Sequence, residues 1–141
     1  MSSPFSSPEE FQDLMDQVFT MMSEDPEMGP KLRDADVPQR FEFSDLDFVL
    51  NVRAATPDEE GYLYWEWSDD VDWEPKVRMT MSSETANKYF QGKENVAMAI
   101  ARRRIKTGGD VKAALALMPI TKPVFERYRE MVSAEYPHLR V

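Results

Sequence analysis

The sequence predicts an α+β fold: a single domain in which one β-sheet is covered by a layer of helices. Three observations carry this prediction. The 141 residues fit one compact domain. Apolar residues recur at helical spacing near the N-terminus and through the second half of the chain, whereas they alternate with polar residues between positions 46 and 81. Strands that are grouped between helices, rather than alternating with them one by one, are typical of an α+β domain.

The first helix has a clear start signal. Ser7 is predicted as its N-cap, Pro8 stands in the first turn, and Glu10 completes a capping box. The three prolines and one glycine among residues 23–39 predict a linker, with at most one helical turn near residues 30–33. The helix carries one apolar stripe that the rest of the fold must cover: Phe11, Leu14, Met15, Val18, Phe19 and Met22.

Three strands are predicted in the middle of the chain. Strict alternation over residues 46–52 predicts a half-buried strand. Residues 56–61 contain the proline and glycine of a turn, and the strand predicted over residues 62–67 therefore pairs with the first as an antiparallel hairpin. A third alternating segment covers residues 77–81, after an acidic loop.

The second half is predicted to be mainly helical, because capping residues and glycines divide it into short periodic segments. The expected elements, in order, are a helix capped by Ser82 or Ser83 and ended by Gly92, a helix over residues 95–101, an extended segment over residues 102–107 stopped by Gly108 and Gly109, a helix capped by Asp110 and closed by Pro119, and a last helix opened by Thr121 and Pro123.

Composition excludes several functional classes. Cysteine is absent and His138 is the only histidine, which removes disulfides, thiolate nucleophiles and Cys-based metal sites. We expect His138, three residues from the end, to be an exposed tail residue. No nucleophile–base pair or metal cluster is recognisable, so we expect a protein without enzyme activity, catalytic residues, bound metal or cofactor.

The charge balance bears on the partners. The chain has 17 Lys and Arg against 26 Asp and Glu, a net charge of −9. Binding to nucleic acid depends on basic residues that displace counterions from phosphates, so we expect no nucleic-acid partner. The same balance argues against strong docking on an anionic membrane. No apolar run approaches the ~20 residues that span a bilayer, and the N-terminus does not resemble a signal peptide. We therefore expect a cytoplasmic protein that is not transmembrane.

Three polar segments each have a functional and a structural interpretation. The acidic loop over residues 68–75 offers carboxylates for calcium, but it lacks the glycine and the distal glutamate of an EF-hand loop, which favours solvated charge between two strands. The turn over residues 107–110 precedes a helix, whose N-terminus is a candidate phosphate site, although Asp110 in the cap position would repel an anion and favours a simple strand-to-helix turn. Arg102, Arg103 and Arg104, with Lys106 and Lys112, form a basic cluster that suits either a lipid headgroup or a charged edge strand.

Methionines and aromatic residues are the most suggestive feature of the composition. Ten methionines and sixteen aromatic residues occur in the chain. Methionine is flexible and polarisable, so it fills irregular cores and also lines adaptable apolar pockets. Ordinary core and an enclosed apolar cavity both remain open at this point. The methionines predicted to point inward are Met15, Met22, Met79, Met81, Met98, Met118 and Met131.

From Val77 onward, several motifs occur in a recognisable order. They are Val77-Arg78-Met79-Thr80-Met81-Ser82, Phe90-Gln91-Gly92-Lys93, Ile105-Lys106, Gly109-Asp110, Ala113-Ala114-Leu115-Ala116-Leu117 and Pro123-Val124-Phe125-Glu126-Arg127-Tyr128, with Phe48-Val49-Leu50-Asn51-Val52 at the place of a first core strand. Together they resemble the sterol carrier protein type 2 family, with an ending like that of bacterial members. The likeness covers residues 41–128 of a single domain of residues 1–141, and residues 1–39 form the N-terminal helix and linker. Arg103 departs from the pattern, since glycine is usual near its position.

The resemblance implies a mixed, mainly antiparallel sheet of about five strands, covered by helices, with an apolar tunnel between the layers. It also implies non-catalytic binding or transfer of a fatty acyl chain, a sterol or another lipid. The residues predicted to contact such a small hydrophobic ligand are Phe48, Leu50, Trp65, Trp67, Met79, Met81, Phe90, Met98, Ile100, Leu115, Met118 and Phe125.

One alternative function belongs to a different class. A protein-interaction or dimerisation domain would keep the same fold with a filled core. Such a domain would form a homodimer through the N-terminal helix, with Phe11, Phe19 and Met22 in the contact.

Overall fold

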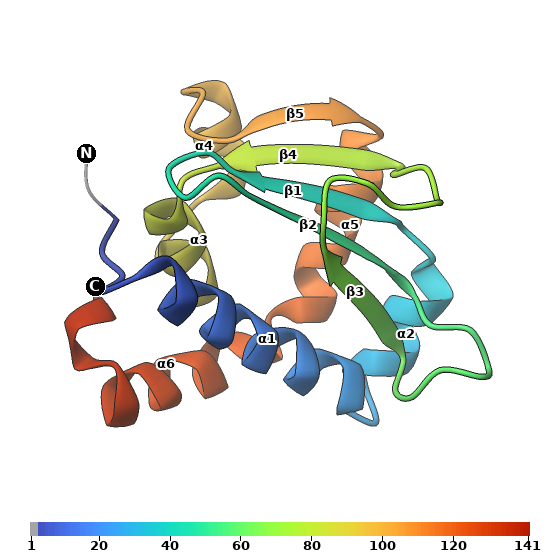
Figure 1. Cartoon of the computed structure of the whole chain (residues 1–141), viewed down its shortest axis with the longest axis horizontal. Coiled ribbons are helices and arrows are strands. Elements are labelled where there is room, and N and C mark those ends of the chain that lie inside the picture. The colour runs from blue at the N-terminus through green and yellow to red at the C-terminus, as the bar shows by residue number, and fades with distance from the viewer. Residues whose placement is uncertain (1–2) are drawn as a thin grey trace.

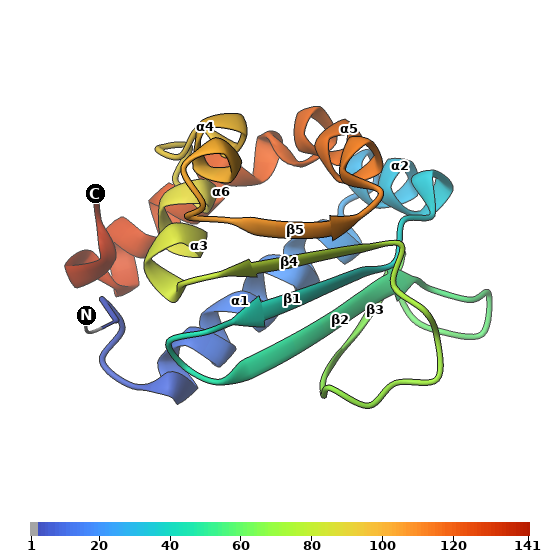
Figure 2. The same ribbon diagram turned by 90° about the horizontal axis from the view of Figure 1, so that it is seen from above.

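A computed structural model describes residues 3–141 as one mixed β-sheet covered on one face by helices. The sheet arches over helices α1, α5 and α6 in Figure 1, and Figure 2 shows the same layers from above. The predicted α+β class is confirmed. In chain order the elements are α1 (Pro8–Glu24), α2 (Met28–Ala35), β1 (Gln39–Phe43), β2 (Phe48–Ala54), β3 (Leu63–Trp67), β4 (Val77–Met81), α3 (Ser83–Phe90), α4 (Val96–Ala101), β5 (Lys106–Gly109), α5 (Val111–Thr121), α6 (Pro123–Glu135) and a short 3₁₀ turn, Pro137–Leu139.

The sheet has five strands in the order β3-β2-β1-β4-β5. Only β1 and β4 run parallel, and the other three pairs are antiparallel. This confirms the mixed, mainly antiparallel sheet. The register places Phe41 opposite both Leu50 and Met79, so these three side chains share the face that the helices cover.

The start of the sheet differs from the sequence prediction. The single strand predicted from residue 46 is preceded by a separate strand, β1, and β2 begins only at Phe48. A tight turn joins them: the Leu46 amide donates to the Phe43 carbonyl over 3.1 Å, and Asp47 has a left-handed φ of 57°. Aspartate tolerates this conformation better than most residues because its side chain bonds locally.

Three elements of the predicted linkers and helices also need correction. The segment predicted as a linker contains a full helix, α2. The predicted extended segment over residues 102–107 begins only at Lys106, because residues 102–105 form a turn, and Gly108 and Gly109 are the last two residues of β5. Pro119 does not end its helix: α5 continues through it to Thr121. A proline removes only one backbone donor there, and α5 has two further residues before its end.

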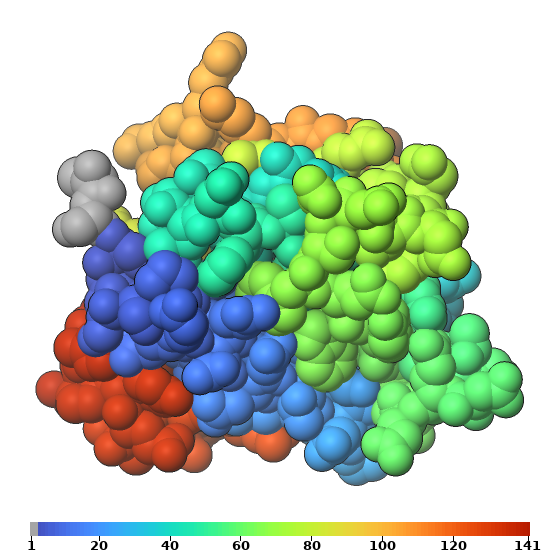
Figure 3. Space-filling view, in the orientation of Figure 1, coloured from blue at the N-terminus to red at the C-terminus, as the bar shows by residue number. Residues whose placement is uncertain are grey.

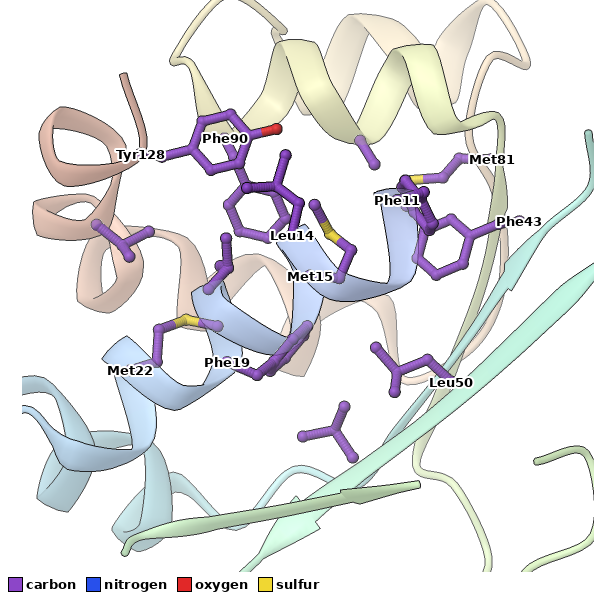
Figure 4. Packing of buried hydrophobic residues seen from close by; sticks show 14 of the residues in the cluster. Phe11, Leu14, Met15, Phe19, Met22, Phe43, Leu50, Met81, Phe90 and Tyr128 are labelled. Atoms are coloured by element: carbon purple, nitrogen blue, oxygen red, sulfur yellow. The ribbon is translucent and has the colours of Figure 1, made fainter. Parts of the chain in front are cut away.

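Helix α1 is the main cover of the sheet. Its predicted cap is confirmed, since the Glu10 amide donates to Ser7 Oγ over 3.1 Å, although the Glu10 carboxylate accepts from the Ser6 amide instead of the Ser7 amide. Every residue of the predicted apolar stripe is buried, and in Figure 4 Phe11 lies beside Phe43 of the sheet while Leu14 points toward Phe90 of α3. Phe11, Phe19 and Met22 are therefore unavailable for the predicted homodimer contact. That contact is wrong, because the rest of the same chain already covers them.

The C-terminal tail is docked rather than frayed. Leu139 is 1% exposed, and its carbonyl accepts hydrogen bonds from Asn87 Nδ2 at 2.8 Å and Gln91 Nε2 at 2.7 Å. His138 is exposed as predicted, but its Nε2 lies 2.8 Å from Glu10 Oε1. The tail is therefore tied to both α1 and α3, and the predicted exposure of His138 is confirmed.

The face of the sheet that the helices leave open carries an ion pair. Arg53 donates to both carboxylate oxygens of Glu59, at 2.7 and 2.9 Å, and its guanidinium lies over the rings of Tyr64 and Trp73. The Arg53 hydrogen bonds, helped by the Thr56 amide, lower the pKa of Glu59 to about 2. The pair thus holds the loop after β2 on the sheet.

This pair predicts a pH dependence of stability. A carboxylate whose pKa is lowered by folding stabilises the protein above its unfolded pKa, and this stabilisation disappears as the pH falls through the folded value. We expect Glu59→Gln to have a lower Tm than the wild type at neutral pH, and the difference to shrink between about pH 4.5 and pH 2. Thermal melts across this range measure the effect. The neighbouring variant Glu60→Gln is the control, and a constant gap for Glu59→Gln would contradict the prediction.

Candidate functional site

An apolar pocket of about 110 Å³ lies between the inner face of the sheet and the helices. Its walls come from every strand and from helices α1 to α5, so residues far apart in the sequence meet in it. The lining residues are Met15, Phe19, Met22, Leu32, Val37, Gln39, Phe41, Phe43, Val52, Arg53, Ala54, Leu63, Met79, Met81, Ala86, Tyr89, Phe90, Val96, Ile100, Ile105, Thr107, Val111, Ala114, Leu115, Leu117, Met118 and Thr121.

Methionines make up much of the wall. Met15 and Met22 come from α1, Met79 and Met81 from β4, and Met118 from α5. Strand alternation turns both β4 methionines to the helix-covered face, and helical spacing does the same for the pair on α1. Because methionine side chains change rotamer at low cost, these walls are able to yield to an entering apolar group.

Few polar groups reach the pocket. The Tyr89 hydroxyl and Thr121 Oγ1 lie 3.1 Å apart, and Thr121 donates to the Met118 carbonyl. Burial raises the pKa of Tyr89, so this hydroxyl stays neutral at physiological pH. Arg53 is the only charged lining residue, and its guanidinium lies on the opposite face of the sheet, paired with Glu59. The interior therefore offers neutral hydrogen bonding and no free charge to a ligand.

The predicted ligand contacts divide into two equal groups. One group lines the pocket: Met79, Met81, Phe90, Ile100, Leu115 and Met118. The other group lies outside its lining: Phe48, Leu50, Trp65, Trp67, Met98 and Phe125.

The residues outside the pocket have distinct positions. Trp65 and Trp67 donate their indole N–H groups to Asp16 Oδ1, at 3.1 and 2.7 Å, and so fill the space beneath α1. Leu50 is buried beside them on the sheet, whereas Phe125 packs edge-on against Tyr89. The prediction that Met98 points inward is wrong, because this residue is 42% exposed.

Several lining residues were not among the predicted contacts. Met15, Phe19 and Met22 belong to a stripe that the sequence marked as buried, but its spacing did not show what the stripe covers. Phe41 and Phe43 lie on β1, the strand that the periodicity did not separate. A polar cluster at residues 44–47 was the available signal for that strand boundary.

The polar alternatives find structural explanations. Within residues 3–141 no group of three or more His, Cys, Asp or Glu side chains is arranged to hold a metal ion. Asp110 Oδ1 accepts from the Ala113 amide over 3.1 Å and so caps α5 itself. Gly109 has a φ of 79°, and a Cβ there would overlap the Lys76 carbonyl. The turn over residues 107–110 is accordingly explained by backbone packing. No helix in the described chain combines the length and apolar character needed to cross a bilayer.

Comparison with protein families gives one match. The sequence profile of the SCP-2 sterol transfer family matches residues 16–122, most of the chain. No curated protein matches the chain.

Solved structures with the same fold are distant in sequence. A UbiJ-SCP2 ubiquinone synthesis protein has a TM-score of 0.60 at 11% identity, with 87% of this chain and 96% of that chain covered. Apo sterol carrier protein 2 from Yarrowia lipolytica has a TM-score of 0.57 at 16% identity, with 88% and 95% covered. The inverting sec-alkylsulfatase Pisa1 from Pseudomonas sp. has a TM-score of 0.56 at 17% identity over 70% of this chain. This chain spans only 14% of that sulfatase, so the likeness concerns one part of a larger protein.

Proposed function

The chain belongs to the SCP-2 sterol transfer family, and from this membership we propose that it binds a lipid in the apolar pocket between sheet and helices. Family membership supports binding or transfer of lipid in general. More specifically, we propose that the ligand is a neutral apolar chain or ring system. A cytoplasmic protein would bind it without catalysing a reaction. The observation that carries it is the continuous apolar lining shared by the sheet and five helices.

The size of the pocket limits what binds without rearrangement. Its volume of about 110 Å³ is of the order of the engineered ~150 Å³ cavity that accepts benzene. A single ring or a few methylene groups therefore fit the observed pocket, whereas a long acyl chain or a sterol needs the walls to move. The five methionines in the lining provide that adaptability. Each Å² of apolar surface that leaves water then contributes ~25 cal/mol before the costs of association.

Native mass spectrometry of the purified protein, followed by lipid extraction, tests the proposal directly. We expect a bound species whose mass matches a lipid and which disappears under denaturing conditions. Thermal shift measurements with several lipid classes, delivered from cyclodextrin, then rank the ligands. No co-purified lipid and no shift with any class would contradict the proposal.

Filling the pocket should weaken binding. Met118→Trp places a larger side chain in the lining, and overpacking of an apolar site costs about 1–3 kcal/mol, so we expect at least a roughly fivefold loss of lipid affinity. Met98→Trp is the matched control, because Met98 lies outside the lining on the surface. Both variants should melt cooperatively, and fluorescence competition with a soluble lipid probe measures their affinities. Equal affinity of both variants would show that the ligand lies elsewhere.

A further inference from the structure

Exposed cations gather at one corner of this acidic protein. Residues 93–112 contain six basic and two acidic residues, although the whole chain has a net charge of −9. Both acidic residues are paired: Glu94 lies 2.7 Å from the Arg104 guanidinium, and Asp110 lies 4.0 Å from Lys76 Nζ. Within residues 3–141, Arg102 and Arg103 form no ion pair with a carboxylate. The corner therefore keeps an uncompensated positive charge.

Apolar side chains accompany these cations. Met98 on α4 is 42% exposed and Leu115 on α5 is 37% exposed, and the chain connects the two helices through the basic turn and β5. In Figure 2, α4 and α5 stand on the same side of β5, and the orange segment projects from the top of the molecule in Figure 3. We define the α4–α5 corner as Met98, Arg102, Arg103, Lys112 and Leu115.

The corner adjoins the pocket. Leu115 is the only exposed residue among those that line the pocket, and Ile100 reaches the lining from α4. Leu115 therefore borders both the pocket and the solvent. The apolar face of α1 offers no comparable surface, because it is buried against the sheet.

Arg103 has a backbone conformation that is unusual for arginine. Arg103 has a φ of 61°, in the left-handed region where glycine is favoured and a long side chain is strained. Its side chain is exposed and forms no ion pair in the described chain, so the fold gains nothing visible from an arginine there. A strained residue without a structural partner is often held for function.

We propose that the α4–α5 corner docks on the surface of an anionic phospholipid bilayer and brings the pocket wall at Leu115 to it. The cations contact headgroup phosphates, and Met98 and Leu115 enter the interfacial region. The proposal rests on the proposed lipid-binding function, since docking here gives lipid a short route into the pocket. A local patch is sufficient despite the acidic chain, because exposed charges farther than a Debye length, roughly 8 Å at physiological ionic strength, are largely screened.

Vesicle sedimentation tests the proposal with the full chain. Wild-type protein should bind vesicles of phosphatidylcholine mixed with phosphatidylglycerol, bind phosphatidylcholine vesicles weakly, and be released by salt. Arg103→Gly should weaken binding about fivefold, the equivalent of roughly 1 kcal/mol for each basic residue near the surface. The same variant should keep or raise the Tm, because glycine relieves the left-handed backbone. Weaker vesicle binding by this variant would therefore not be explained by a loss of stability.

Charge reversal provides a matched pair. Arg102→Glu with Arg103→Glu should abolish vesicle binding, whereas Lys122→Glu with Arg140→Glu, which makes the same change at exposed sites elsewhere, should leave it intact. Equal binding to both vesicle types, no effect of Arg103→Gly, or equal losses in the two double variants would overturn the proposal.

Lipid uptake from cyclodextrin separates this proposal from the proposed function. Uptake without vesicle binding by the wild type would reject the docking surface and leave the function intact. Vesicle binding without uptake would reject the function alone.

Discussion

Phe11→Ala is expected to lower the free energy of unfolding by about 4 kcal/mol, the range found when a buried phenylalanine is truncated. Phe11 is fully buried, and its ring lies 4.9 Å from Phe5, 4.7 Å from Phe43 and 6.3 Å from Trp67, measured between centroids. The alanine variant loses these contacts and leaves a cavity where α1 meets the sheet. Since small domains are stable by only about 5–15 kcal/mol, this is a large share of the total.

Urea unfolding followed by circular dichroism measures this loss. Asp13→Ala on the exposed side of α1 is the control and should change stability by no more than about 0.5 kcal/mol. If Phe11→Ala is too unstable to purify, Phe11→Leu keeps most of the volume and should show a smaller loss in the same direction. A loss below about 2 kcal/mol for the alanine variant would mean that the cluster does not hold α1 in place.

Asn87→Ala is expected to cost about 3 kcal/mol and to release the C-terminal tail. Asn87 is fully buried: its Nδ2 donates to the Leu139 carbonyl, and its Oδ1 accepts from Tyr128 at 2.6 Å and from Gln91 at 2.9 Å. Removing the amide leaves the buried Tyr128 hydroxyl and one Gln91 N–H group without partners, and each buried unsatisfied group costs about 1–3 kcal/mol. Urea unfolding gives the energy, and hydrogen exchange at residues 136–141 reports the tail.

Tyr128→Phe is the matched comparison for this network. It removes one donor to Asn87 Oδ1, but Gln91 still occupies that oxygen, so a loss of about 1 kcal/mol is expected with the tail still protected. Equal losses in the two variants, or a tail that stays protected in Asn87→Ala, would show that the tail is held by Gln91 and by Leu139 packing instead.

The sequence predicted helices best where a capping residue stands at the start of a segment with helical spacing of apolar residues. Ser7, Ser82, Asn95 and Asp110 each accept a backbone hydrogen bond at the start of the helix predicted for them. The hairpin of β2 and β3 was predictable for the same reason, since alternation and a Pro/Gly turn coincide. The separation of β1 from β2 was not, because a turn at Asp47 interrupts the chain without glycine or proline.

The candidate site was half predictable. Strand alternation and helical spacing identify residues that face inward, such as Met79 and Met118, but they do not say which inward residues border empty space. Trp65 and Trp67 face inward too, yet they are fixed by hydrogen bonds to Asp16 on α1 and lie outside the pocket. That contact joins residues about fifty positions apart, and no local pattern encodes it.

The sequence by itself determined the α+β class, most helix starts, the buried stripe of α1 and the uneven charge around Arg102–Arg104, because each depends on residues within a few positions of one another. Only the tertiary structure decided the parallel pairing of β1 with β4, the docking of Leu139 on α3 and the position of the pocket. Those features depend on how side chains from distant parts of the sequence pack in one core. Because a protein interior is closely packed, whether a side chain fills a space or leaves it open depends on all of its neighbours.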